Sequence, residues 1–113
     1  MTNPSIITKA YDLLKYLIVN ILKKVPKDQR FLIGSHIQAA AQEVLELVIA
    51  AYYSPPADKK PMLAKVNIKL EILRHYLRLC FELGYYDSTK YKFAAEQIDE
   101  IGRMAGSWLK SIK

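Results

Sequence analysis

Residues 63–80 read LAKVNIKLEILRHYLRLC, and this stretch decides the fold class. Apolar side chains recur along it at alternating intervals of three and four positions. That interval is typical of a helix that packs one seam against other helices in a bundle. The seam residues are Leu63, Val66, Leu70, Leu73, Leu77 and Cys80. The stretch therefore predicts an all-α protein built as a helical bundle.

The segments on either side of this stretch carry helix signals and no strand signal. Residues 54–57 (SPPA) form the clearest break before it, and Asp58 is the predicted N-cap of its helix. Gly84 fits the left-handed residue that ends a helix, and Asp87 or Ser88 can cap the next one. Short connections favour sequential antiparallel neighbours, so we expect an up-down four-helix bundle. The predicted helices cover about residues 6–24, 27–53, 58–83 and 87–111, in a single domain over residues 1–113.

The helix over residues 27–53 is predicted to be continuous. Pro26 disfavours helical geometry at Val25 before it, which ends the first helix, and it can sit in the first turn of the second. Gly34 lies inside this helix. The side expected to pack carries Phe31, Ile37, Ala41, Leu45, Val48 and Tyr52.

The first helix is apolar nearly all round, which indicates burial on more than one side. One face carries Ile7, Ala10, Tyr11, Leu14, Leu17, Ile18 and Ile21, and the opposite face carries Leu13, Tyr16 and Val19. In so small a domain this predicts contact with another subunit. The eight tyrosines could stack on bases, but interface packing is the favoured interpretation. The predicted interface residues are Tyr11, Leu14, Ile18, Tyr52 and Tyr76.

Composition points to an ordinary globular protein of 113 residues, 51% hydrophobic and 25% charged. A single cysteine, Cys80, excludes an intrachain disulfide and fits a reducing compartment. No segment resembles a membrane span or a signal peptide. We therefore expect a cytoplasmic protein.

The residues for catalysis or metal binding lack the usual spacings. The two histidines, His36 and His75, form no zinc-ligand pattern, so we expect no metal and no cofactor. Asp99 and Glu100 precede Arg103 by four and three residues, the spacing of surface ion pairs. No nucleophile constellation or phosphate loop occurs. The sequence therefore predicts a protein that is not an enzyme.

Basic residues give the stronger functional signal, within a net charge of +6. A row of basic residues on one helix can neutralise phosphates of a nucleic acid whatever its nucleotide sequence. The alternative is that these residues only form the solvated outer face of a bundle helix, and the sequence of one chain favours the two interpretations almost equally. The row comprises Lys65, Lys69, Arg74 and Arg78, and a second cluster at the first helix junction comprises Lys23, Lys24, Lys27 and Arg30. This second cluster could extend the same surface or meet a protein partner.

Four stretches resemble, in order, the accessory variability determinant (Avd) family of diversity-generating retroelements. Together they span nearly the whole chain. They are residues 9–17 (KAYDLLKYL), 26–31 (PKDQRF) with Ile33, Gly34 and Ile37, 73–79 (LRHYLRL) with 82–84 (ELG), and 98–104 (IDEIGRM) with 108–111 (WLKS).

The resemblance implies a four-helix bundle that assembles as a homopentameric barrel with a basic surface. It also implies binding to the element's reverse transcriptase and to RNA or DNA, in support of mutagenic retrohoming. The protein would hold RNA template or cDNA against the polymerase and supply no catalytic group.

A related family, the ribosomal RNA intervening-sequence proteins, shares the bundle. An oligomeric RNA-binding or structural module of that kind is the alternative. The chain departs from the Avd pattern at Gly106-Ser107, where two adjacent glycines are often found, and at His36, where a basic residue is expected.

Overall fold

The computed structural model of the protein describes residues 4–112. This part of the chain is helical, with short turns and no strand. The elements are α1 (Pro4–Tyr16), a π-helical turn η1 (Leu17–Ile21), a 3-10 turn η2 (Leu22–Lys24), α2 (Lys27–Arg30), α3 (Ile33–Tyr53), α4 (Pro56–Glu82) and α5 (Ser88–Ser111). The predicted all-α class is confirmed for the described residues.

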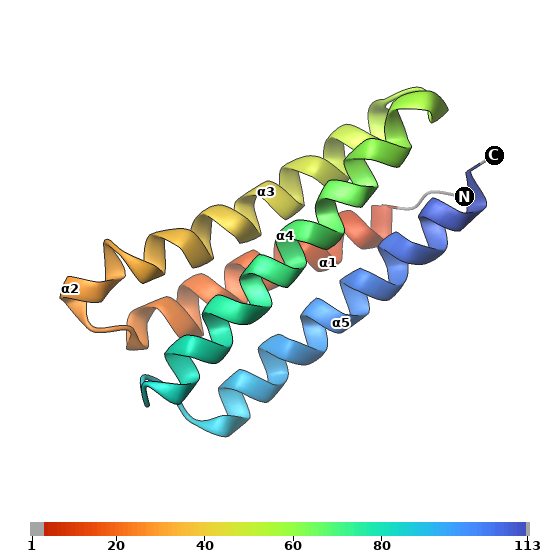
Figure 1. Ribbon diagram of the computed structural model, residues 1–113. Helices are drawn as coiled ribbons and strands as arrows, with labels where there is room; N and C mark the ends of the chain where they lie inside the picture. Colours follow the sequence, from red (N-terminus) through yellow and green to blue (C-terminus); the bar gives the residue numbers. More distant parts are fainter. Residues whose placement is uncertain (1–3, 113) are drawn as a thin grey trace.

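Four long helical stretches lie side by side as a bundle (Figure 1). The first is α1 continued by η1 and η2, and the others are α3, α4 and α5. Each runs antiparallel to the one before it, and α3 and α5 each pack against both α1 and α4. The bundle measures 44 × 24 × 19 Å. One end, called here the α2 end, carries α2 and the α4–α5 turn, while α1 begins and α5 ends at the other.

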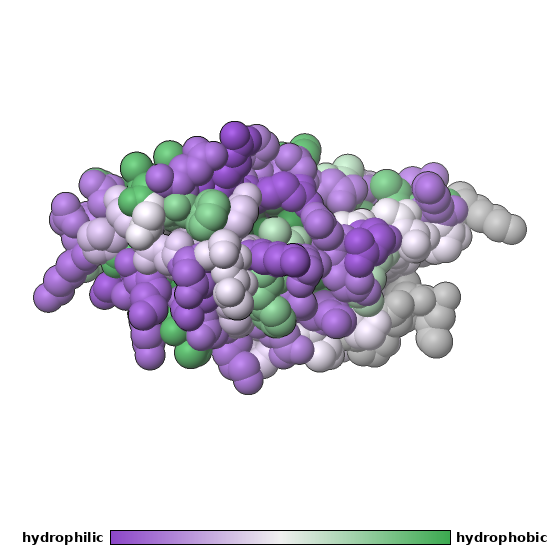
Figure 2. Space-filling model, turned by 90° about the horizontal axis from the view of Figure 1, so that it is seen from below, coloured by the Kyte–Doolittle hydropathy of each residue, from purple (hydrophilic) through white to green (hydrophobic). Residues whose placement is uncertain are grey.

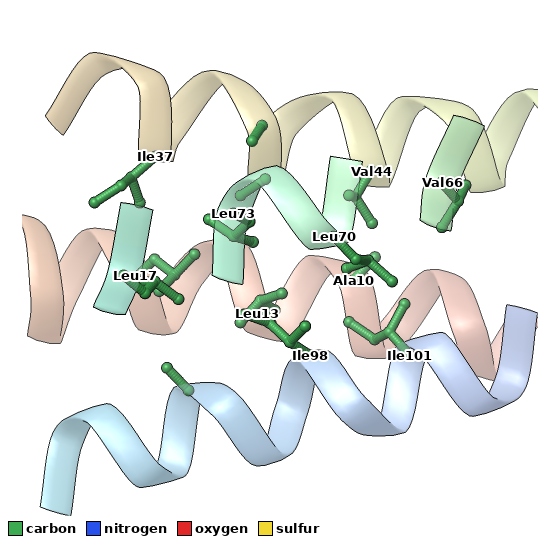
Figure 3. Packing of buried hydrophobic residues seen from close by; sticks show 14 of the residues in the cluster. Ala10, Leu13, Leu17, Ile37, Val44, Val66, Leu70, Leu73, Ile98 and Ile101 are labelled. Carbon is green, nitrogen blue, oxygen red and sulfur yellow. The ribbon is translucent and has the colours of Figure 1, made fainter. Parts of the chain in front are cut away.

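The core is apolar along the whole bundle. In Figure 3, side chains from all four stretches point inward, including Leu13 of α1, Ile37 of α3, Leu73 of α4 and Ile98 of α5. Among the described residues, no charged or polar side chain is buried in it. All six seam residues predicted on α4 are buried, as their spacing requires.

The π-helical turn corrects the register of the first helix. After Leu17, a regular α-helix would turn Asn20 and Lys24 toward the core. The π turn contains one extra residue, so Ile21 and Val25 are fully buried instead. Asn20 stays half-buried and Lys24 exposed. The prediction of one regular helix over residues 6–24 is therefore wrong in geometry, because apolar spacing alone does not reveal an inserted residue.

The core-facing side of α1 draws on both of the apolar faces read from the sequence. Leu13 is 1% exposed, whereas Tyr11 and Ile18, from the other face, are 55% and 41% exposed in the single chain. A helix that is apolar nearly all round offers little contrast to fix which side turns inward.

The second predicted helix is broken at Phe31 and Leu32. The Leu32 backbone leaves the α region, with φ −101° and ψ −89°, and α3 starts afresh at the next residue. Phe31, expected to pack, is 79% exposed. Gly34 is buried, and a methyl on it would meet Leu22 and the Arg30 stem at 3.5 Å, an ordinary van der Waals distance. The Phe31 ring lies outside the core.

The start of α4 also differs from the prediction. Pro55 is the N-cap, and Asp58 lies inside the first turn, where its backbone N–H donates to the Pro55 carbonyl at 2.9 Å. Pro56 has the backbone φ that a first helical residue needs, so it starts the helix two residues before Asp58.

The turn between α4 and α5 follows its predicted signals. Gly84 has φ +82°, and hydrogen bonds from the backbone N–H groups of Gly84 and Tyr85 to Phe81 and Cys80 close a Schellman motif. The Asp87 side chain then accepts a hydrogen bond from the Lys90 N–H at 2.9 Å and caps α5. Both predicted end signals are confirmed.

Candidate nucleic-acid interface

The arginines of the α4 row already have carboxylate partners, and one of these partners lies on α5. Arg74 Nη2 donates to Asp99 Oδ1 at 2.8 Å, and Nη1 bonds to Glu71. Arg78 Nε donates to Glu82 Oε2 at 2.9 Å. This hydrogen bond and the charge of Glu82 raise the pKa of the Arg78 guanidinium. A phosphate at either arginine would have to compete with a carboxylate of the same chain.

The lysines of the same row lie toward α3. Lys69 Nζ is 2.9 Å from Glu43 Oε1, and both lie in a shallow groove of about 560 Å³ between α3 and α4. Lys65 lines this groove as well, together with Glu46. Positive and negative groups therefore alternate in the groove, which weakens its attraction for a chain of phosphates.

The pairing of Asp99 differs from the prediction. The spacing suggested that both Asp99 and Glu100 serve Arg103, but only Glu100 bonds to it. Asp99 bonds across to Arg74 instead, because α5 packs against α4.

Arg30, at the α2 end, serves the backbone. Its Nη2 donates to the carbonyls of Val25 at 3.0 Å and Lys23 at 3.3 Å, and its Nε donates to Val25 at 3.3 Å. Carbonyls at a helix C-terminus lack helical partners and carry the negative end of the helix dipole. Arg30 therefore caps the first helix and ties α2 to it.

The three lysines around Arg30 differ from the α4 row in the partners that the described part of the chain offers them. Lys23, Lys24 and Lys27 are exposed, and among residues 4–112 none has a carboxylate within ion-pair distance. We call these three residues the lysine corner. Of the predicted basic clusters, this one presents the most freely available positive charge.

The predicted interface residues fall into two groups by their solvent exposure. Tyr11 and Ile18 are exposed, as described above. Leu14, Tyr52 and Tyr76 are half-buried at the edge of the core. The ring of Tyr76 stacks on His36, with centroids 5.1 Å apart and planes 3° from parallel. On the face drawn in Figure 2, hydrophobic side chains show as separate patches among hydrophilic ones.

A groove on α3 was not predicted from the sequence. It has a volume of about 360 Å³ and opens at the α2–α3 break. The sequence did not reveal it, because Phe31 was expected to pack inside the bundle. The spacing of Gln38 and Gln42, one turn apart, was the available signal. The lining residues are Arg30, Phe31, Ser35, Gln38, Ala39 and Gln42.

The described residues were also searched for membrane-spanning helices and for metal-binding clusters. Between residues 4 and 112, no helix is long and apolar enough to cross a membrane. Within the same span, no three His, Cys, Asp or Glu side chains gather in a way that could hold a metal ion.

A family model described as bAvd-like matches residues 5–112, nearly the whole helical bundle. The chain belongs to the bAvd-like family. The match supports the first of the two resemblances found in the sequence. No curated protein matches the chain.

The structure describes the two positions at which the sequence was expected to depart from the Avd resemblance. At the position expected to be basic, His36 is exposed and stacks on Tyr76. At Gly106, a methyl group would meet no described atom within 4 Å. The space above Gly106 is therefore open in the single chain.

Proposed function

We propose that this bAvd-like chain is a non-enzymatic, cytoplasmic accessory protein of a diversity-generating retroelement. It binds the element's reverse transcriptase and its template RNA or cDNA, and it thereby supports mutagenic retrohoming. The observation that carries this proposal is the family match across residues 5–112. The net charge of +6 agrees with an anionic partner.

In this proposal some basic side chains bind phosphate and one has a structural role. The lysine corner supplies charges that need no rearrangement before they meet a phosphate. Arg74, Arg78 and Lys69 also bind phosphate when it replaces their carboxylate partners. Lys65 lies on the same helix and adds its charge. Arg30 holds the corner in place. Contacts of this type bind nucleic acid strongly at low salt and weakly at high salt.

The proposed assembly is a homopentameric barrel. Its subunit contacts would use Tyr11, Leu14, Ile18, Tyr52 and Tyr76. Tyr11 and Ile18 expose apolar surface that a single chain leaves in water, and burying apolar surface drives association. A ring would also repeat each basic surface around one axis and strengthen the binding of a long strand.

The role of the α4 arginines is tested with a double variant, Arg74→Gln with Arg78→Gln. We expect weaker binding to template RNA or to the reverse transcriptase at low salt. For RNA, the salt dependence should become shallower by about 0.7 to 0.9 in log–log slope for each phosphate that the variant no longer neutralises. Binding is measured by fluorescence anisotropy for RNA and by co-purification for the polymerase.

Two matched variants sharpen this test. Glu82→Gln leaves Arg78 in place but removes its partner, so RNA binding should strengthen. Arg103→Gln removes an exposed arginine whose carboxylate partner is Glu100 on α5, and binding should stay unchanged. Unaltered affinity of a folded double variant for both partners would refute the assignment of the arginines.

A further inference from the structure

The groove on α3 has a chemical character unlike that of the α4 row. All six of its lining residues are exposed, and none is acidic. One wall begins at the aromatic ring of Phe31. The amide side chains of Gln38 and Gln42 follow along α3, one turn apart, with Ala39 between them. An aromatic face, neutral amides and nearby cations thus occur together.

The backbone turn that carries Phe31 is held by hydrogen bonds before any ligand arrives. At 79%, it is the most exposed large hydrophobic side chain of the described chain. The Leu32 N–H donates to the Gln29 carbonyl at 3.0 Å, and Ser35 Oγ donates to the Leu32 carbonyl at 2.6 Å. These bonds fix the turn that presents the ring, so binding to it needs little further ordering.

The lysine corner adjoins this groove. Lys27 precedes Phe31 by four residues along α2 and its C-cap, which places both on the same side. Arg30 lines the groove while its guanidinium holds the carbonyl of Lys23. Lys27, which has no carboxylate partner among residues 4–112, therefore lies on the same side of α2 as the exposed ring.

This combination fits an unpaired nucleotide. Bases stack on aromatic side chains whatever their identity, and amide groups can donate to and accept from a base edge. Both contacts require an unstacked base with a free edge, which a duplex does not offer. A protein partner docking through Phe31 alone would leave the lysine charges without a role.

We propose that the α3 groove binds single-stranded nucleic acid, with one base stacked on Phe31, its edge against Gln38 and Gln42, and neighbouring phosphates at Lys23, Lys24 and Lys27. This inference rests on the proposed function in taking nucleic acid as the partner. It adds a site outside the α4 row and a preference for unpaired strands.

The test uses the full chain, a labelled single-stranded oligouridylate and a blunt RNA duplex of equal length, at low salt. Phe31→Ala should weaken single-strand binding about 5- to 150-fold, which corresponds to roughly 1–3 kcal/mol for one stacked base. Phe31→Tyr should retain binding. The matched control is Tyr53→Ala, because Tyr53 is 78% exposed at the far end of α3 and should leave binding unchanged.

A second measurement reports stacking directly. Phe31→Trp places an indole at the groove, while the native Trp108 is only 7% exposed. Addition of oligouridylate should quench the new fluorescence, and Gln38→Ala with Gln42→Ala should reduce the affinity of this variant. Absence of quenching when the strand is bound would overturn the stacking contact.

The outcomes separate this site from the general proposal. If wild-type protein binds neither the oligouridylate nor the duplex, both the nucleic-acid part of the proposed function and this inference are refuted. Wild-type binding that Phe31→Ala leaves intact would overturn only the site. Equal loss of duplex and single-strand binding would overturn the preference for unpaired strands. A reduced oligomeric mass of Phe31→Ala with RNA affinity unchanged would identify the groove as a contact between copies of the chain, and would also overturn the site.

Discussion

Two basic residues at opposite ends of the bundle perform the same task. Arg30 binds the carbonyls that end the first helix, and Lys59 Nζ binds those of Ala51 at 2.7 Å and Tyr52 at 3.2 Å, which end α3. Lys59 also lies 5.6 Å from the centroid of the Trp108 ring. Both side chains add to the net charge, yet they are engaged in holding the helix ends. At the residue scale, net charge therefore overstates the surface available to an anion.

Loss of the Arg30 cap should cost stability. Arg30→Ala removes charge-assisted hydrogen bonds to Val25 and Lys23 at a solvent-exposed site, and we expect the free energy of unfolding to fall by about 1–2 kcal/mol. Arg30→Lys should recover only part of this, since an ammonium lacks the forked geometry. Urea denaturation followed by circular dichroism measures the change. Lys27→Ala, in the same short helix, is the control and should be nearly neutral; an equal effect of both variants would contradict the capping role.

At the scale of the helix, the sequence predicts packing better than it predicts interruptions. The α4 seam follows from six apolar positions set among polar ones, so only one orientation buries them. The π turn and the break at Leu32 leave no comparable signal. Neither contains glycine or proline. The π turn keeps Asn20 and Lys24 out of the core, and the break at Leu32 leaves Phe31 exposed. The same limit applies to the candidate site. The spacing of Lys65, Lys69, Arg74 and Arg78 predicts that they form a row on one helix. It cannot predict the partners Glu43 and Asp99, which depend on how α3 and α5 pack against α4.

The π turn makes a prediction about deletions. Removing Val19, which is 49% exposed, should convert η1 to a regular α-helix and still leave Ile21 and Val25 in the core, so the protein should fold. Removing Asp12 instead should rotate Ile6 and Ala10 away from the core by about 100° and cost several kcal/mol. Thermal unfolding monitored by circular dichroism compares the two. An equally severe loss of stability in both variants would show that the π turn does not absorb an extra residue.

For the whole molecule, the exposed apolar side chains gather on faces that the single chain does not cover. Tyr11 and Ile18 lie on the outside of the first helix, and Ile68, Ile72 and Leu79 lie on the outside of α4. These side chains keep 39% to 59% of their surface exposed in the single chain, so part of their apolar surface remains to be buried by a partner. Their burial would favour assembly, which makes mass and fold separable by experiment.

Light scattering should give wild-type protein a mass near five times the 13.0 kDa of one chain. Tyr11→Ser with Ile18→Glu should lower this mass while leaving the helical content intact, because neither side chain is buried within its own bundle. Lys92→Glu, an exposed charge change on α5, should keep the wild-type mass. If the α1 variant retains the pentameric mass, the subunit contacts lie elsewhere, and the apolar face of α4 becomes the next surface to change. If wild-type protein is itself monomeric, the pentameric barrel is excluded, and the retroelement role would then depend on RNA and polymerase binding by single chains.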